Sequence, residues 1–568
     1  MHTQTPNIQE LFTAGVNEAE NVLKTFHDIE PDESDKQWRA SIFSQYPRRF
    51  AHKLAREYEE KYIFESRRAA NLYLLDQKDR NEVRQIPLTS NEHDLEQLAK
   101  NHSSEMRQLA MIMPDDEQAV IKLWPLAKSY GIKPPNLYDP NITPMGILNR
   151  LWDEDWWLRQ LRRAHAINLE EEAINLGFVH QRAGIYISDE SLLRYKEQKI
   201  RNRRILSRMI AINEENQIFK LEDLIAKGTS NPINRRNELM CRVFGFENIA
   251  NELAHAADFL TLTCPSRMHA ILSKSGSVNP KYDGTTPKQA QKYLTTIWSR
   301  IRAKLKRDGI EIYGFRVAEP HQDGTPHWHL LVFTDPNNLK AIRDTFSHYA
   351  LEEDGHEVGA LEHRFTFKPI DKTKGSAIGY IAKYISKNID GYAIDKDELG
   401  VDAKDSSERV TAWASTWGIR QFQQFGGAPV TIWRELRKAK TNIPEGILSK
   451  AFDAADSGNW AEFLKLLGGA TPIRKELPIQ LNKIEPDELG KYGDPVGKQI
   501  TGLIAHNIKL ITRIHEWSII SVKLLTQMLE SVPIFNTEAD ESNCGDAYAR
   551  ASAVGIDTSG EAALEYCQ

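Results

Sequence analysis

The spacing of hydrophobic and polar residues divides the chain near residue 245. Upstream of this position, apolar residues recur every three or four positions within long charged stretches, and prolines interrupt the pattern between 114 and 144. The clearest amphipathic stretches are 51–75, 93–112 and 151–175. We therefore predict that a first region, residues 1–245, is mostly α-helical.

Residues 246–440 follow a different pattern. Short runs rich in β-branched and aromatic residues predict strands at 259–263, 311–319, 328–333 and 363–367. Helical patterns separate the first strand from the second and the third from the fourth, at 287–307 and 336–352. This βαββαβ order predicts an α+β fold with a central antiparallel sheet of the ferredoxin or RNA-recognition-motif type. Helices are expected on one face of the sheet, and the other face is expected to be free for a site.

A further helix is predicted at about 374–389 and carries two tyrosines, Tyr380 and Tyr384. Residues four positions apart lie on the same side of an α-helix. At about 100° per residue, both phenols fall outside the apolar stripe of this helix, near Lys383 and Lys387. We therefore interpret the two tyrosines as candidate functional groups rather than as core residues.

The pattern weakens after residue 440. Helical spacing continues through about 530, so we predict a helical C-terminal region at 441–535. Residues 536–568 are acidic and poor in large apolar side chains, which predicts a disordered tail. The central antiparallel sheet is thus expected to lie in the second of four parts of the chain, 246–440.

The formal net charge of −6 hides an uneven distribution of charge. Residues 531–568 hold seven acidic side chains and one basic side chain, so the rest of the chain has 72 of each sign. The stretch 288–307 has seven lysines and arginines and no acidic residue, and basic residues also dominate 194–208. One basic stretch is usually a solvated helix face, but two of them, together with the lysines beside the tyrosines, indicate a polyanionic partner.

Membrane insertion and export are both disfavoured. No apolar run is long enough to cross a bilayer, and the N-terminal MHTQTPNIQE lacks a basic segment followed by an apolar one. The four cysteines include no CxxC pair, which argues against a disulfide scaffold and against a cysteine-based zinc site. We expect the protein to work in a reducing cytoplasm.

The third predicted strand begins with His327-Trp328-His329. Alternation along a strand sends both imidazoles to the same face, where they can share one metal ion. The second strand ends at Glu319 and a tight connection follows it, so Glu319 is the predicted third ligand, with His321 as the substitute. Two imidazoles and a carboxylate suit Mg²⁺ or Mn²⁺ that also carries a phosphate oxygen. The spacing differs from that of a cupin or a metallo-β-lactamase, each of which needs further ligands soon after the histidine pair.

The combination of two histidines on a strand with two tyrosines on a helix some fifty residues later resembles the two-tyrosine branch of the HUH endonuclease superfamily. More closely, the chain resembles the bacteriophage replication gene A protein family over about 250–440. The matching stretches are EPHQDGTPHWHLLVF (319–333), GYIAKYISKNIDG (379–391) and, for the first strand motif of the family, FLTLT (259–263).

This resemblance implies initiation of rolling-circle replication. The expected reaction is metal-dependent, site-specific nicking of one DNA strand at an origin, which leaves a 5′-phosphotyrosyl bond and a free 3′-OH, followed by strand transfer and rejoining. Tyr380 and Tyr384 would be alternating nucleophiles, and Lys383 or Lys387 would favour the phenolate. The expected partner is origin DNA, as a single strand, a cruciform or a melted duplex, in the cytoplasm of a bacterial host.

The stretch GDPVGKQ at 493–499 imitates a Walker A loop. It has three residues between its glycines instead of four, and Gln499 stands where Ser or Thr would bind Mg²⁺. We therefore assign no ATPase activity, and expect strand separation to depend on a host replicative helicase.

Two alternatives remain open. Within the superfamily, the chain could be a relaxase or a transposase, which are distinguished by a single tyrosine or by different flanking domains. From another class, it could be a non-catalytic module that binds single-stranded DNA on an open sheet. That alternative predicts aromatic side chains on the open face and tolerates loss of both tyrosines.

Overall fold

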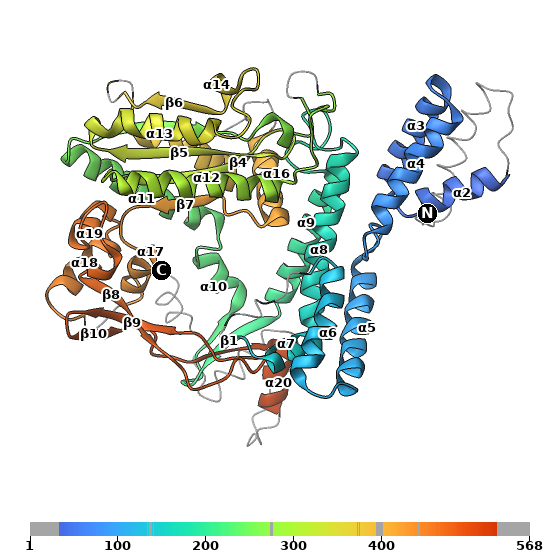
Figure 1. Ribbon diagram of the computed structural model, residues 1–568. Coiled ribbons are helices and arrows are strands. Elements are labelled where there is room, and N and C mark those ends of the chain that lie inside the picture. Colours follow the sequence, from blue (N-terminus) through green and yellow to red (C-terminus); the bar gives the residue numbers. More distant parts are fainter. Residues whose placement is uncertain are drawn as a thin grey trace, which may run out of the picture. The chain divides into compact units, whose positions relative to one another are not determined.

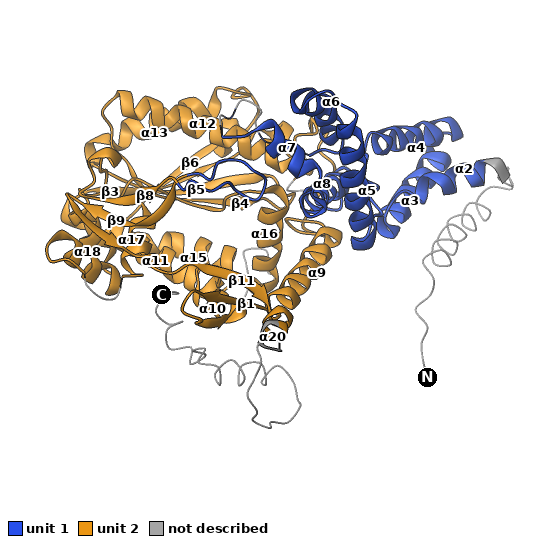
Figure 2. Ribbon diagram, turned by 90° about the horizontal axis from the view of Figure 1, so that it is seen from below, with its two compact units in different colours: residues 1–179, 486–497 blue, residues 180–485, 498–568 orange. Residues whose placement is uncertain are grey.

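The computed structural model describes residues 33–530 except 133–134, 136–138, 140, 273–275, 372, 374, 393–401 and 440–442. The chain forms two compact units: residues 1–179 with 486–497, and residues 180–485 with 498–568 (Figure 2). The predicted disordered tail, 536–568, lies outside the described residues. The predicted domain limits at 245, 440 and 535 stay predictions. None of the helices among the described residues is both long enough and apolar enough to cross a membrane.

The first unit is helical among its described residues, as predicted. Several of its helices begin at a side-chain cap: the Asn91 side chain accepts from the Asp94 N–H in a capping box, and Asp115 and Thr143 cap two others. The described helices of this unit are α2 (Glu33–Phe43), α3 (Arg48–Phe64), α4 (Arg67–Glu82), α5 (Glu92–Met111), α6 (Asp116–Ser129), α7 (Pro144–Leu151) and α8 (Glu154–Asn175). A buried core around Leu95 and Trp157 joins the last four of these helices.

The segment 486–497 returns to this unit and contains most of the Walker-like stretch. The Asp494 carboxylate accepts a hydrogen bond from the Thr143 N–H at 2.8 Å and pairs with the Arg150 guanidinium at 2.5 Å. Gly146 leaves room for this carboxylate, because a Cβ at that position would overlap it. The stretch therefore docks a loop on α7 through Asp494.

The central sheet of the second unit has five strands in the order β6-β3-β5-β4-β7, and every neighbouring pair is antiparallel (Figure 1). The four predicted strands are confirmed, and the fifth, β7, joins the edge beside β4. The strands are β3 (Ala256–Leu262), β4 (Tyr313–Pro320), β5 (Pro326–Thr334), β6 (Phe365–Pro369) and β7 (Phe422–Phe425).

Helices cover both faces of this sheet. On one face, Trp328 donates to Gln291 of α12 (Pro287–Arg307), and α13 (Leu339–Leu351) contacts β3 and β6. On the other face, Leu331 and Phe333 share a core with α11 (Pro232–Glu252) and α15 (Ala377–Ile389). The expectation of a free second face is therefore wrong, because this face is apolar over most of its length and has to be covered. Its polar end lies at the β4–β5 turn.

The predicted helical C-terminal region is also wrong between 479 and 521, where the chain forms four strands. Three of them make a separate antiparallel sheet, β8 (Ile479–Ile484), β9 (Gln499–Ala505) and β10 (Ile508–Ile511). The fourth, β11 (Trp517–Ser521), pairs with β1 (Met209–Asn213), which in turn pairs with β2 (Ile218–Lys220) inside the region predicted to be helical. These strands are short, and the partner of β11 lies some 300 positions away, so local spacing gave little sign of them.

The remaining elements of the second unit are helices and single 3₁₀ turns. The helices are α9 (Asp189–Leu206), α10 (Leu221–Lys227), α14 (Ala360–His363), α16 (Ala403–Trp417), α17 (Val430–Leu436), α18 (Ile447–Asp456), α19 (Trp460–Leu466) and α20 (Val522–Glu530). The 3₁₀ turns are η1 (Ser266–Met268), η2 (Pro336–Asn338) and η3 (Arg474–Glu476).

Candidate active site

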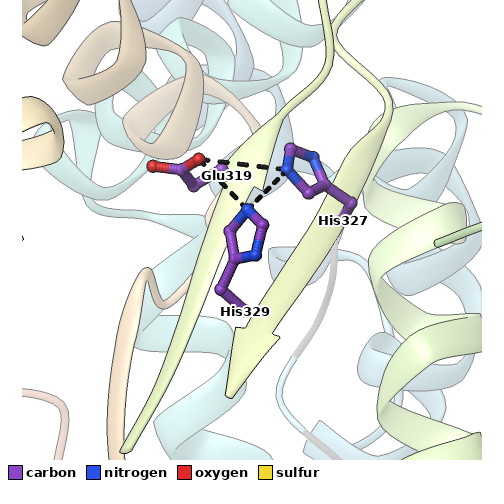
Figure 3. Close-up of side chains that lie close together, drawn as sticks. All are labelled: Glu319, His327 and His329. Atoms are coloured by element: carbon purple, nitrogen blue, oxygen red, sulfur yellow. Dashed lines mark hydrogen bonds and ion pairs between the residues drawn. The ribbon is translucent and has the colours of Figure 1, made fainter. Parts of the chain in front are cut away.

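Glu319, His327 and His329 meet at the polar end of the central sheet. Antiparallel pairing places Glu319 of β4 directly opposite His327 of β5, and His329 follows on the same face (Figure 3). The Nε2 atoms of the two histidines are 3.0 Å apart, and the Glu319 Oε2 lies 3.6 Å from that of His329 and 3.9 Å from that of His327. The three side chains are largely buried and point toward one another.

The surroundings favour the protonation states that a metal requires. Burial lowers the pKa of His327 well below its usual 6.5, so its imidazole is neutral at physiological pH. Burial raises the pKa of the Glu319 carboxyl, but hydrogen bonding with His329 and the charge of Lys387 outweigh it, and the net pKa is below 4.5. Glu319 is therefore a carboxylate. The Thr261 hydroxyl lies 3.0 Å from the His329 Nδ1. When His329 carries its proton on Nδ1 and donates it to Thr261, instead of donating from Nε2 to Glu319, the Nε2 lone pair faces the cluster and can bind a metal.

This donor set fits a divalent cation. One ligand atom from each of the three residues lies within 4.8 Å of the others, and Figure 3 shows all three facing one region. Two facing Nε2 lone pairs repel each other unless a proton or a cation lies between them. Nitrogen and oxygen ligands without sulfur suit Mg²⁺ or Mn²⁺. His321, the substitute ligand, stands outside this group of described residues, although its ring lies 4.0 Å from that of His327.

The tyrosine helix, α15, begins at Ala377 and brings its phenols to this cluster. The Ser376 side chain caps it by accepting from the Gly379 N–H, and Glu247 of α11 accepts from the Ala377 N–H at 2.6 Å. Ile381 and Ile385 are fully buried against the sheet, which confirms the predicted apolar stripe at these two positions. The helix is therefore held at its N-terminus and along one face.

Both tyrosines lie on the side of α15 that faces the histidines. The Tyr384 ring stacks at a tilt against His329, with 4.2 Å between ring centroids. Phe259 of β3 lies 5.2 Å from the Tyr384 ring and 6.2 Å from the Tyr380 ring, so the two phenols share one aromatic neighbour. The Lys368 Nζ of β6 lies 5.0 Å from the centre of the Tyr380 ring. Both tyrosines are half-buried and pack against the edge of the core.

The two lysines predicted on this helix have different surroundings. Lys387 is buried, and its Nζ lies 3.7 Å from the Glu319 Oε2 and 5.6 Å from the centre of the Tyr186 ring. Lys383 is exposed. The structure therefore brings Lys387 to the carboxylate of the cluster and leaves Lys383 on the solvent side of the helix.

Sequence reasoning missed two residues that hold the cluster together. Asn388 is buried, and its Nδ2 donates both to the Glu319 Oε1 and to the backbone carbonyl of Tyr384 at 2.6 Å. It therefore ties the tyrosine helix to the carboxylate. Thr261 was part of the predicted FLTLT strand, but its position opposite His329 follows from the pairing of β3 with β5. The spacing of four between Tyr384 and Asn388 was the signal available for the first.

In comparisons with known proteins, a family model and several relatives point to the same family. The family model described as bacteriophage replication gene A protein matches residues 90–392, a range that includes every residue of this site. The replication gene A protein of Escherichia phage 186 is 42% identical over 384 residues, covering 65% of this chain and 55% of that protein. The replication protein of Haemophilus phage HP1 is 42% identical over 383 residues, covering 66% of this chain and 48% of that protein.

A third relative is the probable replication endonuclease from a prophage-like region of Salmonella typhimurium. It is 34% identical over 418 residues, covering 70% of this chain and 50% of that protein. The chain thus spans about half the length of the curated relatives it matches. No solved structure matches the chain.

Proposed function

Because the chain belongs to the bacteriophage replication gene A protein family, we propose that it is a replication initiation endonuclease that nicks one strand of origin DNA with a tyrosine nucleophile. The observation that carries this proposal is the Tyr384 ring beside His329, 4.2 Å between centroids, at a carboxylate and two imidazoles suited to a metal ion. The names of relatives from prophage-like regions, probable replication endonucleases, support nuclease activity.

The fold supports placement in the HUH endonuclease superfamily. The strand order β6-β3-β5-β4, with α12 and α13 as the connections on one face, is that of a ferredoxin-like sheet. In this arrangement β5, which carries the histidine pair, is central, and β4 beside it carries Glu319. The tyrosine helix follows the last strand of the motif and returns to the polar end of the sheet.

The proposed reaction is a transesterification. A Tyr Oη–phosphorus bond forms, the bond between phosphorus and the 3′-oxygen breaks, and the phenolic proton is balanced by the proton that the leaving 3′-oxygen takes up. A divalent cation held by Glu319, His327 and His329 would act there as a Lewis acid on the scissile phosphate. Lys387 places a positive charge beside this carboxylate, where it helps to neutralise charge that develops on the phosphate.

Two phenols on one helix allow two successive transfers. A tyrosine that is already esterified to DNA cannot cut the regenerated origin, whereas a second tyrosine one turn away can. We assign Tyr384 to the position next to the histidines and Tyr380 to the neighbouring position beside Lys368. Lys383, exposed on the same turn, is proposed to neutralise the bound phosphate backbone.

The proposed partner is origin DNA in a single-stranded, cruciform or melted form, in the cytoplasm of the bacterial host. Basic side chains lie on α12 and toward the C-terminal end of α9, where Lys199, Arg203 and Arg204 are exposed, and Arg208 is exposed just beyond this helix. A host replicative helicase is proposed as the second partner. A relaxase or transposase remains the alternative within the superfamily.

The test is capture of the covalent adduct. The full chain is incubated with supercoiled origin plasmid and Mg²⁺ or Mn²⁺, and relaxed circles with attached protein are digested for peptide mapping. We expect the adduct on Tyr384 or Tyr380, and its complete loss in the Tyr380→Phe/Tyr384→Phe double variant while DNA affinity is kept. A matched control is Tyr392→Phe, which removes an exposed phenol just beyond the same helix. An adduct that persists in the double variant refutes the assignment. A non-catalytic DNA-binding module would give no adduct with the wild-type chain.

A further inference from the structure

A cavity of about 530 Å³ lies in the second unit, next to the candidate active site. Its walls come from four parts of the chain that are well separated in sequence: residues 180–182, the segment after β3, the β4–β5 turn and the loop with α14 before β6. The lining includes the apolar side chains of Cys264, Ile271, Leu272 and Val358. Cys264 and Ile271 are buried, whereas Leu272 and Val358 are exposed at the rim.

One side chain separates this cavity from the metal ligands. His321 lines the cavity, and its ring lies against that of His327, tilted by 32° with 4.0 Å between centroids. The β4–β5 turn that carries His321 is rigidly held, because Trp413 donates to the Gly324 carbonyl and Thr325 donates to the Met268 carbonyl. A chain of nucleotides whose phosphate lies at the metal ligands can therefore place a neighbouring nucleotide in the cavity.

Other lining residues are polar, and some of them are buried. Arg364 and Asp323 are only 3% and 4% exposed, and Asp323 accepts from or shares a proton with the His269 Nδ1 at 3.0 Å. Within the described part of the chain, the Nε and Nη1 of Arg364, the Oγ of Ser266 and the Nε2 of His321 have no hydrogen-bond partner. Buried polar groups are nearly always paired, so these three side chains leave hydrogen-bonding capacity beside the cavity, which a polar ligand can use when a side chain turns toward it.

We propose that this cavity binds one unpaired nucleobase of the DNA strand, adjacent to the phosphodiester that is cut. The inference rests on the proposed function, since it assigns the nucleotide to the strand held at Glu319, His327 and His329. A pocket lined by both apolar side chains and polar groups can hold a base removed from its stack, by packing on its face and hydrogen bonds to its edge.

A base fits this cavity better than a phosphate does. Two carboxylates line the wall: Asp323 beside His269, and Glu357, whose Oε2 accepts from the Ser266 N–H at 3.2 Å. Carboxylates repel phosphate, but they accept hydrogen bonds from the amino groups of bases, while Arg364 donates to base carbonyls and ring nitrogens. The site would thus contribute to the choice of origin sequence.

The experiment uses the full chain and single-stranded oligonucleotides that span the nick mapped with wild-type protein. Each oligonucleotide lacks one base, and the initial rate of adduct formation is measured. We expect one position within a few nucleotides of the nick to lose roughly tenfold or more in rate, the loss typical of removing one stacked base. The variant Leu272→Trp fills the cavity from its rim. It should form the adduct with the complete oligonucleotide as slowly as wild-type protein does with the oligonucleotide that lacks the critical base. Removing that base should not slow the variant any further.

A matched control is Leu361→Trp, which adds the same indole at an exposed position that does not line the cavity. It should behave as wild-type, and the thermal midpoints of both variants should agree with wild-type within a few degrees. Equal rates for all abasic oligonucleotides, or wild-type base dependence in Leu272→Trp, would overturn the proposal. Competition by millimolar deoxynucleoside monophosphates together with a flat abasic series would assign the cavity to a free nucleotide and also overturn it.

Failure of the proposed function gives a different result. In that case wild-type protein forms no adduct with any DNA, and the cavity is tested by the fluorescence anisotropy of labelled single strands. At least roughly fivefold weaker binding by Leu272→Trp than by Leu361→Trp supports a base in the cavity even then. Equal affinities refute it.

Discussion

Two buried glutamates in the second unit, Glu319 and Glu435, show how a site differs from a structural ion pair. They are 2% and 1% exposed, each lies beside a lysine, and the pKa of each is held below 4.5 in spite of burial. Burial, charge and pKa therefore do not distinguish them. Their neighbours do.

Three side chains donate hydrogen bonds to the Glu435 carboxylate of α17, and both of its oxygens accept at least one. Thr512 donates at 2.6 Å, Arg513 at 2.8 Å and Lys438 at 3.0 Å. These contacts join α17 to the chain just after β10. A carboxylate saturated by short hydrogen bonds has nothing to offer a ligand, and its role is to hold two elements together.

Glu319 is arranged differently. Asn388 donates to its Oε1, whereas its Oε2 faces Lys387 and two imidazole nitrogens at 3.6 to 3.9 Å. Imidazole nitrogens that are themselves lone-pair donors gain little from a carboxylate unless a cation lies among them. The comparison shows how a ligand site can be recognised: its polar groups face one another but do not use up one another's hydrogen-bonding capacity.

The largest effect expected is on catalysis, and it tests the comparison directly. Glu319→Gln should slow adduct formation by more than about 100-fold, because even loss of a residue behind a metal ligand costs 10- to 100-fold. Glu435→Gln should stay within a few-fold of wild-type. Both rates are measured on the same origin plasmid with Mg²⁺. Near wild-type nicking by Glu319→Gln would remove Glu319 from the ligand set.

For the stability of the fold we expect the substitution of Glu435 to have a large effect, although it has little effect on catalysis. Glu435→Ala removes three hydrogen bonds, two of them to charged groups, and we expect the free energy of unfolding to fall by about 2 kcal/mol. The loss is limited because Arg513 is about half exposed and can be solvated again. Urea unfolding of wild-type and variant measures it, and Glu462→Ala, an exposed glutamate of α19, is the control. An equally stable Glu435→Ala variant would contradict a structural role.

A smaller effect is expected behind the metal ligands. Thr261→Val removes the hydroxyl that lies 3.0 Å from the His329 Nδ1, so the imidazole loses the partner that fixes its tautomer and orientation. We expect the affinity for Mn²⁺ to fall by about tenfold, measured by titration calorimetry or by the electron paramagnetic resonance signal of free Mn²⁺. Thr334→Val, the same change at the far end of β5, should leave this affinity unchanged. Equal affinities in both variants would show that Thr261 does not support the site.

Much of the central domain could be predicted from local patterns. The alternation of β5 correctly placed His327 and His329 on one face, and the spacing of four correctly placed Tyr380 and Tyr384 on one side of α15. Glu319 was predicted because a tight turn returns β4 to β5. These features depend on residues that are close in sequence, where strand and helix periods decide the geometry.

The rest depends on pairing between distant parts of the chain. The position of Thr261 opposite His329 requires that β3 be the neighbour of β5, and β1 finds its partner β11 only after 300 further residues. The covering of the second sheet face by α11 and α15 follows from the total apolar area of that face, which no local window contains. Asn388 could have been noticed by its spacing from Tyr384, but its contact with Glu319 could not.

The smallest effect expected is a change in the pH dependence of stability. Because the folded pKa of Glu435 lies below 4.5, its carboxylate contributes stability that is complete above the pKa of the unfolded chain and is lost as the pH falls through the folded value. Each unit by which the pKa is lowered corresponds to about 1.4 kcal/mol. The difference in unfolding free energy between wild-type and Glu435→Gln should therefore be constant near neutral pH and should shrink below about pH 4.5. Urea unfolding across this range measures it, with Glu462→Gln as the control for removing one exposed negative charge. A difference that stays the same down to the lowest pH would mean that the three donors to Glu435 do not stabilise its ionised form. Glu435 could then no longer serve as the structural ion pair with which Glu319 is compared.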